Sequence, residues 1–171
     1  ASWGPPGHRG EGERAGAGAS ALPADLFQRC AIKALRGDFG PIPEWKRRAY
    51  RWGLRHGITI CGRAKRTTYC PRCSGLICAD GSRVRSGICA ASRNIPLHYV
   101  VWLATDGLLY VTDRGGAVRA HPPYTRPGET ANFDVWKPRC PVHCYRGPGT
   151  KRFVPYAVLG PASLVTGGLH P

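Results

Sequence analysis

Residues 111–119 read VTDRGGAVR, and residues 133–136 read FDVW. Each segment is a short apolar run that carries one aspartate, Asp113 in the first and Asp134 in the second. The glycine pair after Asp113 lets the backbone turn tightly and approach a ligand closely. The two segments therefore predict strands that bring two carboxylates together, which is the arrangement that acid/base cleavage of a glycosidic bond uses.

The composition is that of a loop-rich β protein with a strong positive charge. The 171 residues include 23 Gly and 16 Pro, which favours many turns over a helical bundle. Lys and Arg number 25 against 10 Asp and Glu, a net charge of +15. A field of that sign attracts anionic polymers such as cell-wall polymers or nucleic acid, although it also serves solubility alone. No stretch reaches the ~20 apolar residues of a membrane span.

Helical and strand-like patterns divide the chain. Segments 23–35 and 43–56 have apolar residues at helical spacing, and each is followed by a glycine, Gly37 or Gly57. From residue 58 onward, short β-rich runs alternate with turns, which favours a small barrel. The strands are expected at 58–60, 66–69, 99–103, 108–112, 133–136 and 154–159, with Asp106-Gly107 as a hairpin turn.

These patterns predict a mainly β fold with an α-helical extension, in four parts. Residues 1–21 form a flexible Gly/Ala-rich arm, 22–57 the helical extension, 58–160 the barrel and 161–171 a tail. Near the start no apolar segment typical of a signal peptide is visible, and the chain contains no Met, so we expect that an initiator Met or a longer leader was removed. No internal repeat is apparent.

The second helical segment mixes aromatic and basic residues. Trp45 and Trp52 alternate with Arg47, Arg48 and Arg51. Such a helix either grips an anionic polymer or packs on the barrel through its Trp residues with a solvated basic face. The sequence favours the packed helix.

Eight cysteines leave zinc and disulfides as alternatives. Cys70 and Cys73, with Cys140 and Cys144, have the paired spacing of a four-ligand structural zinc site, with His143 as an alternative ligand. Disulfides account for the same four residues equally well. The remaining cysteines are expected to be bridges, Cys78 to Cys89 and Cys30 to Cys61, or free buried thiols.

Six short motifs, in order, resemble the three-aspartate (3D) domain, which is related to the barrel of membrane-bound lytic transglycosylase A. The resemblance covers roughly residues 66–159 and implies a six-stranded double-psi β-barrel preceded by two short helices. The motifs are Thr67-Thr68-Tyr69, Cys78-Ala79-Asp80-Gly81, residues 87–92 (GICAAS), Ile95-Pro96-Leu97, residues 112–119 (TDRGGAVR) and Phe133-Asp134-Val135-Trp136.

The resemblance also implies roles for individual residues. Asp134 takes the place of the family's catalytic acid/base, and Asp113 that of an aspartate lining the same groove. Arg119 stands where the family usually has Lys, and Ser92 where it has its first Asp. Asp80 offers a replacement groove carboxylate. These three residues are expected to contact substrate.

The environment of Asp134 is expected to suit acid catalysis. Burial by Phe133 and Trp136, together with the neighbouring Asp113, is expected to raise the pKa of Asp134. Trp136 is also expected to contact substrate.

The function implied is that of a peptidoglycan-acting lytic transglycosylase that cleaves the MurNAc–GlcNAc bond with one Asp as acid and then base. It needs no cofactor beyond a possible structural zinc, and it is expected outside the cytoplasm, secreted or associated with a cell wall or virion. Ser92 and the apparent insertion at 121–130 favour an alternative, a non-catalytic barrel that serves as an assembly component of a virion, filament or envelope and binds protein partners through its N-terminal arm. A nucleic-acid-binding protein is the remaining alternative.

Overall fold

A computed structural model describes residues 21–58, 60–72, 74–139 and 150–171. The chain is mainly β, with six strands and three helices. The expected N-terminal arm lies almost wholly outside the described residues. In chain order the elements are α1 (Pro23–Arg36), α2 (Glu44–His56), β1 (Ile60–Tyr69), β2 (Ile88–Ala91), β3 (Tyr99–Leu103), β4 (Gly107–Asp113), β5 (Ala131–Trp136), β6 (Lys151–Pro161) and α3 (Ala162–Val165).

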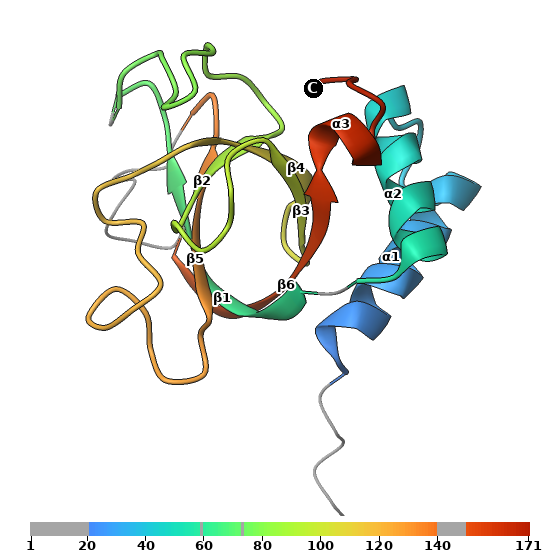
Figure 1. Cartoon of the computed structure of the whole chain (residues 1–171), viewed down its shortest axis with the longest axis horizontal. Coiled ribbons are helices and arrows are strands. Elements are labelled where there is room, and N and C mark those ends of the chain that lie inside the picture. The colour runs from blue at the N-terminus through green and yellow to red at the C-terminus, as the bar shows by residue number, and fades with distance from the viewer. Residues whose placement is uncertain (1–20, 59, 73, 140–149) are drawn as a thin grey trace, which may run out of the picture.

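The six strands form one mixed sheet that closes on itself (Figure 1). Its order is β1-β5-β2-β4-β3-β6, and β6 pairs with β1 to complete the barrel. Two of the six pairings are parallel, β1 with β5 and β2 with β4. The other four are antiparallel. A closed sheet leaves no unpaired edge strand.

The pairing pattern contains a two-fold repeat. Exchanging β1 with β4, β2 with β5 and β3 with β6 leaves every pairing and every direction unchanged. The first three strands therefore pair in the same way as the last three. The sequence shows no repeat because the equivalence lies in the hydrogen-bonding pattern and not in shared residues.

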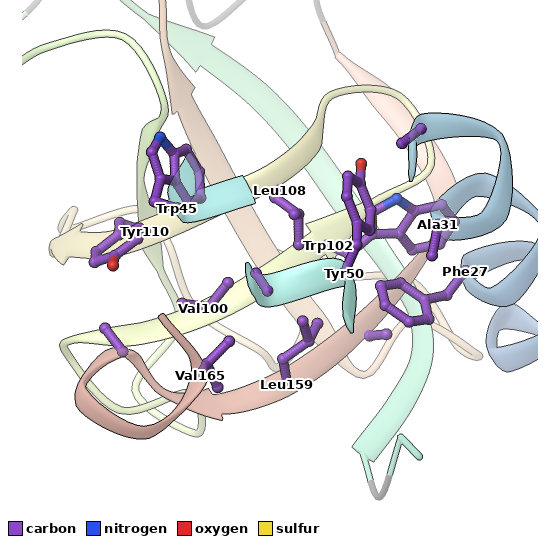
Figure 2. Packing of buried hydrophobic residues seen from close by; sticks show 14 of the residues in the cluster. Phe27, Ala31, Trp45, Tyr50, Val100, Trp102, Leu108, Tyr110, Leu159 and Val165 are labelled. Carbon is purple, nitrogen blue, oxygen red and sulfur yellow. The ribbon is translucent and has the colours of Figure 1, made fainter. Parts of the chain in front are cut away.

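The fold has two apolar cores, one inside the barrel and one between the barrel and the helices. One core receives residues from all six strands and therefore fills the barrel; it includes Val101, Leu109, Phe133 and Val135. The second lies between the helices and the outer face of β3, β4 and β6. There the Phe27 ring meets Trp102 edge-on at 5.7 Å, and the Trp45 ring meets Tyr110 in the same manner (Figure 2).

The expected helices are confirmed to within a residue at each end. Pro23 occupies the first turn of α1, and Gly37 ends that helix in the left-handed conformation with φ 88°. Helix α2 is packed on the barrel through Trp45, which is 4% exposed, as the sequence favours. None of the helices in the described part of the chain is long and apolar enough to cross a membrane.

The predictions after residue 57 miss three features of the structure. Ile60, the last residue of the segment expected at 58–60, begins a continuous strand, β1, which also contains the segment expected at 66–69 and whose polar central residues hide its length. Strand β2 was not expected as a strand, because its four residues are all buried and show no alternation. The expected tail contains the short helix α3.

Four of the described cysteines, which were expected either to form two bridges or to be free buried thiols, are not bridged. Cys30, Cys61, Cys78 and Cys89 are free thiols, so the bridges considered between Cys78 and Cys89 and between Cys30 and Cys61 are not formed. Cys78 and Cys89 are buried, whereas Cys61 is exposed. Cys89 instead contributes its side chain to the core of the barrel.

The contact between α2 and α1 leaves no room for a methyl group at Gly53. A Cβ atom there would lie 2.5 Å from Cζ of the buried Phe27 ring. Substituting Gly53→Ala should lower the free energy of unfolding by about 1–3 kcal/mol, because overpacking outweighs the gain in helix propensity. Denaturant unfolding measures this, with the exposed Arg51→Ala in the same helix as control. A Gly53→Ala variant more stable than wild type would contradict this packing.

Candidate active site

The closed sheet places the two predicted catalytic aspartates in one row. Asp134 of β5 is in register with Thr67 of β1 on one side and with Ala90 of β2 on the other. Ala90 is in turn in register with Asp113 at the end of β4. A register shift after Cys89 makes Asp113, and not Thr112, the partner of Ala90. Only the small Ala90 therefore separates the two aspartates across the sheet.

Asp134 points away from the barrel interior because strand residues alternate between faces. Its neighbours Phe133 and Val135 belong to the interior core. The residue is nevertheless only 5% exposed. Its Oδ1 accepts a hydrogen bond of 2.9 Å from the Thr67 hydroxyl. Asp134 is thus a buried carboxyl group whose hydrogen-bond partner is a neutral side chain.

This environment raises the pKa of Asp134 to about 6. Burial is the main cause, since it disfavours the charged form. The nearby Asp113 adds to the rise, whereas the Thr67 hydrogen bond and the positive charges of Arg66 and Lys65 oppose it. The predicted rise, from burial and a neighbouring carboxylate, is confirmed in direction. Phe133, which was expected to help bury Asp134, instead faces the barrel interior, because successive residues of a strand point to opposite faces.

Asp113 is held by donors from three parts of the chain. Its Oδ1 accepts hydrogen bonds from the backbone N–H groups of Ala79, at 2.9 Å, and Arg114, at 2.8 Å. Its Oδ2 accepts one of 3.2 Å from the Tyr69 hydroxyl. Burial and the adjacent Asp113 raise the pKa of Tyr69, so the phenol keeps its proton and donates it. Asp113 therefore joins the ends of β1 and β4 to the loop before β2.

A buried ion pair lies close to this row. Nε of Arg66 donates to Oδ2 of Asp106 at 2.8 Å, and its Nη2 contacts Oδ1. Lys137 Nζ lies 3.2 Å from the same Oδ1. The hairpin expected at Asp106-Gly107 is confirmed, but its role as the partner of Arg66 is not visible from local sequence. The positive charge of Arg66 also lowers the pKa of Asp134.

The other residues expected to contact substrate are not all in this row. Ser92 is fully buried; its hydroxyl donates to Asn94 Oδ1 at 2.7 Å and accepts from the Asn132 N–H. Trp136 lies two residues beyond Asp134 on β5 and is partly buried. Its indole N–H has no partner among the described residues.

Asp80 and Arg119 line two different cavities. Oδ2 of Asp80 lies 3.2 Å from Nε2 of His98, and both residues line a cavity of about 540 Å³. Arg119 lines another cavity of about 630 Å³; its Nε donates to the Gly116 carbonyl at 2.9 Å. The structure therefore brings Asp134 and Asp113 together and separates Asp80 from Arg119.

The segment expected as an insertion, 121–130, is anchored at its end by a buried carboxylate. Glu129 Oε2 accepts from Nη1 of Arg152 at 2.9 Å and from the Arg126 N–H at 2.8 Å. Its Oε1 accepts from the Phe153 N–H at 3.1 Å. The segment thus reaches β6 and lies on the side of the barrel away from the helices (Figure 1).

Sequence reasoning missed the groups that surround the two aspartates. Thr67 and Tyr69 lie two residues apart on β1, on the face that Asp134 shares. The only signal was their presence in the Thr67-Thr68-Tyr69 motif. Arg66 gave no signal at all, because its partner is 40 residues away.

The predicted zinc site lies mostly outside the described residues. Cys70 is described, whereas Cys73, Cys140, Cys144 and His143 are not. Within the described ranges no group of three or more His, Cys, Asp or Glu side chains is placed to hold a metal ion. Zinc and disulfides at these cysteines both stay predictions.

No protein-family model matches the chain, and no curated protein matches it.

Because the native pKa of Asp134 is raised, its contribution to stability is full below about pH 4 and is lost as the pH rises through about 6. Asp134→Asn removes this loss. The free energy of unfolding of the variant relative to wild type should therefore increase by about 1–3 kcal/mol between pH 4 and pH 7.5. Urea unfolding at both pH values measures this, and a difference that does not change with pH would contradict the assignment. The exposed Asp38→Asn is the control.

Proposed function

We propose that the protein is a peptidoglycan-acting lytic transglycosylase-like enzyme that cleaves the MurNAc–GlcNAc bond, with Asp134 as acid and then base. The observation that carries this proposal is the raised pKa of Asp134, about 6, beside a second aspartate. A general acid must hold its proton near the working pH, and an ordinary aspartate does not.

The barrel is proposed to be a double-psi β-barrel of the three-aspartate type. The support is the two-fold pairing pattern with its two parallel strand pairs, β1 with β5 and β2 with β4. The motifs around Asp113 and Asp134 fall on β4 and β5, which both pair with β2, and this placement of the two aspartates on either side of one strand supports the proposal.

The proposed reaction uses one carboxyl group twice. Protonated Asp134 gives its proton to the glycosidic oxygen as the bond to the sugar's anomeric carbon breaks. The resulting carboxylate then removes the proton from the 6-hydroxyl of the same sugar, whose oxygen attacks the anomeric carbon and closes an anhydro ring. No water is consumed, and Asp134 ends protonated as it began. The negative field of Asp113 favours the protonated state of Asp134 and stabilises the positive charge that develops on the sugar.

The charge of the chain suits this substrate and an extracytoplasmic location. Peptidoglycan stems and wall polymers carry negative groups, and a net charge of +15 holds the protein near them. The proposed reaction needs no cofactor. A structural zinc at Cys70, Cys73, Cys140 and Cys144 remains part of the proposal, with disulfides as the alternative.

Two observations favour the alternative of a non-catalytic assembly component. Asp134 is only 5% exposed, so substrate must displace covering groups to reach it. Ser92, which replaces the family's first aspartate, is fully buried. In this alternative the barrel is a scaffold in a virion, filament or envelope.

A separate observation favours binding to an anionic polymer such as nucleic acid. Arg48, Arg51 and Arg55 of α2, with Trp52, line a cavity of about 390 Å³. Cationic side chains beside an aromatic ring suit a phosphate backbone and its bases.

Digestion of purified peptidoglycan, with products identified by mass spectrometry, tests the proposed reaction. Wild type should release anhydro-muropeptides, and Asp134→Asn should lose at least about 100-fold in rate, the usual contribution of a general acid/base. Activity should fall as the pH rises above about 6, because Asp134 loses its proton. Asp113→Asn should move this fall to lower pH, because Asp113 helps to raise the pKa of Asp134.

The exposed Asp38→Asn serves as control and should act as wild type. Anhydro products at the wild-type rate from Asp134→Asn would refute the role of Asp134. No products from folded wild type would favour the assembly component.

A further inference from the structure

A cavity of about 630 Å³ with a cationic lining lies beside the aspartate row. Its charged and polar lining residues are Arg93, Arg114, Arg119, His121 and Asn94, and none of its lining residues is acidic. Strands β2 and β4 run parallel, and residues 93–94 and 114–116 follow their carboxyl ends. The cavity is thus built where two neighbouring parallel strands end.

Arg114 supplies a fixed positive charge to this cavity. Its Nη1 donates to the Ala91 carbonyl at 2.8 Å, and its Nη2 donates to the Ile95 carbonyl at 2.7 Å. Two bonds to neutral carbonyls hold the guanidinium in place without cancelling its charge. Burial and the nearby Arg93 lower the pKa of Arg114, although Asp113 opposes this. The like charges are therefore close enough to repel one another.

Arg93 and Arg119 are exposed and flank the fixed charge of Arg114. Arg119 is oriented by its Nε bond to the Gly116 carbonyl and by the Tyr124 ring, whose centroid lies 5.1 Å from its Cζ. Gly116 has no neighbouring atom within 4 Å of a Cβ position, which leaves the rim open. Three guanidinium groups around an open cavity with no lining carboxylate suit an anionic ligand, since Arg binds carboxylate and phosphate groups bidentately.

The cavity is within reach of a ligand bound at Asp134. Ala90 is the register partner of Asp134, and Arg93 lies three residues further along the chain, in the turn after β2, so its backbone is at most about 10 Å from that of Ala90. Arg114 directly follows Asp113. A polymer chain that crosses the aspartate row thus passes the mouth of this cavity.

The geometry points to an anionic subsite: the cavity lined by Arg93, Arg114 and Arg119 binds a carboxylate or phosphate substituent of the glycan whose backbone lies at Asp134. This inference rests on the proposed function for the identity of the glycan. It assigns the cationic lining a part in selecting the substrate, separate from bond cleavage.

Calorimetric titration of the full chain carrying Asp134→Asn tests the subsite without turnover. The probes are a MurNAc-containing tetrasaccharide, which carries lactyl carboxylates, chitotetraose, which carries none, and a glycerol-phosphate oligomer. The acidic tetrasaccharide should bind at least tenfold more tightly than chitotetraose. Adding Arg93→Gln and Arg119→Gln should abolish this difference and leave chitotetraose binding unchanged. Competition by the glycerol-phosphate oligomer would identify phosphate as a second source of the anion.

The matched control is Arg29→Gln with Arg36→Gln on α1, which removes the same charge from exposed positions outside the cavity. Equal weakening by both double variants would mean that net charge alone acts, and this would overturn the subsite. Equal binding of the acidic and neutral tetrasaccharides, or no binding of either, would overturn it as well. Failure of the proposed function is distinguishable, because it would appear as selective acidic binding without anhydro products from the unsubstituted protein.

Discussion

The fold and the site both depend on the pairing of β1 with two strands from the far end of the chain, β5 in parallel and β6 antiparallel. This pairing closes the sheet and sets Thr67 beside Asp134. The same closure separates an apolar interior from an outer face, and α1 and α2 cover that face mainly over β3, β4 and β6. The outer face of β1, β5 and β2 is consequently where buried polar groups gather, and the aspartate row lies there.

Three buried carboxyl groups of this protein differ in the partner that each one has. Asp106 lies against the Arg66 guanidinium and Glu129 against that of Arg152, and each also accepts further hydrogen bonds. Asp134 accepts its hydrogen bond from a neutral hydroxyl and lies near a second carboxylate. Desolvation without a directly bonded cation is what raises the pKa of Asp134, since guanidinium pairing stabilises the charged form. A group of this kind is suited to give and take a proton, whereas the paired carboxylates are suited to hold the chain together.

Much of this arrangement follows from local sequence signals, and the missing parts are long-range. The helices were predicted closely because Pro23, Gly37 and Gly57 mark their ends. The placement of Asp134 near Asp113 was anticipated from two apolar segments that each carry an aspartate. Strand β2 and the length of β1 were missed because a fully buried strand and a polar one both lack alternation. Thr67, Arg66 and the cationic cavity were missed because their meaning comes from register across the closed sheet, which residue spacing does not encode.

The central claim is that Asp134 retains its proton well above the range of an ordinary aspartate because of its place in the closed sheet. Titration of the side-chain carboxyl carbons by ¹³C NMR tests it most directly, with the Asp134 signal assigned from its absence in Asp134→Asn. The account predicts that this carboxyl group titrates with a pKa of about 6. Titration near the ordinary value of about 4 would contradict the account and would remove the chemical basis for acid catalysis at Asp134.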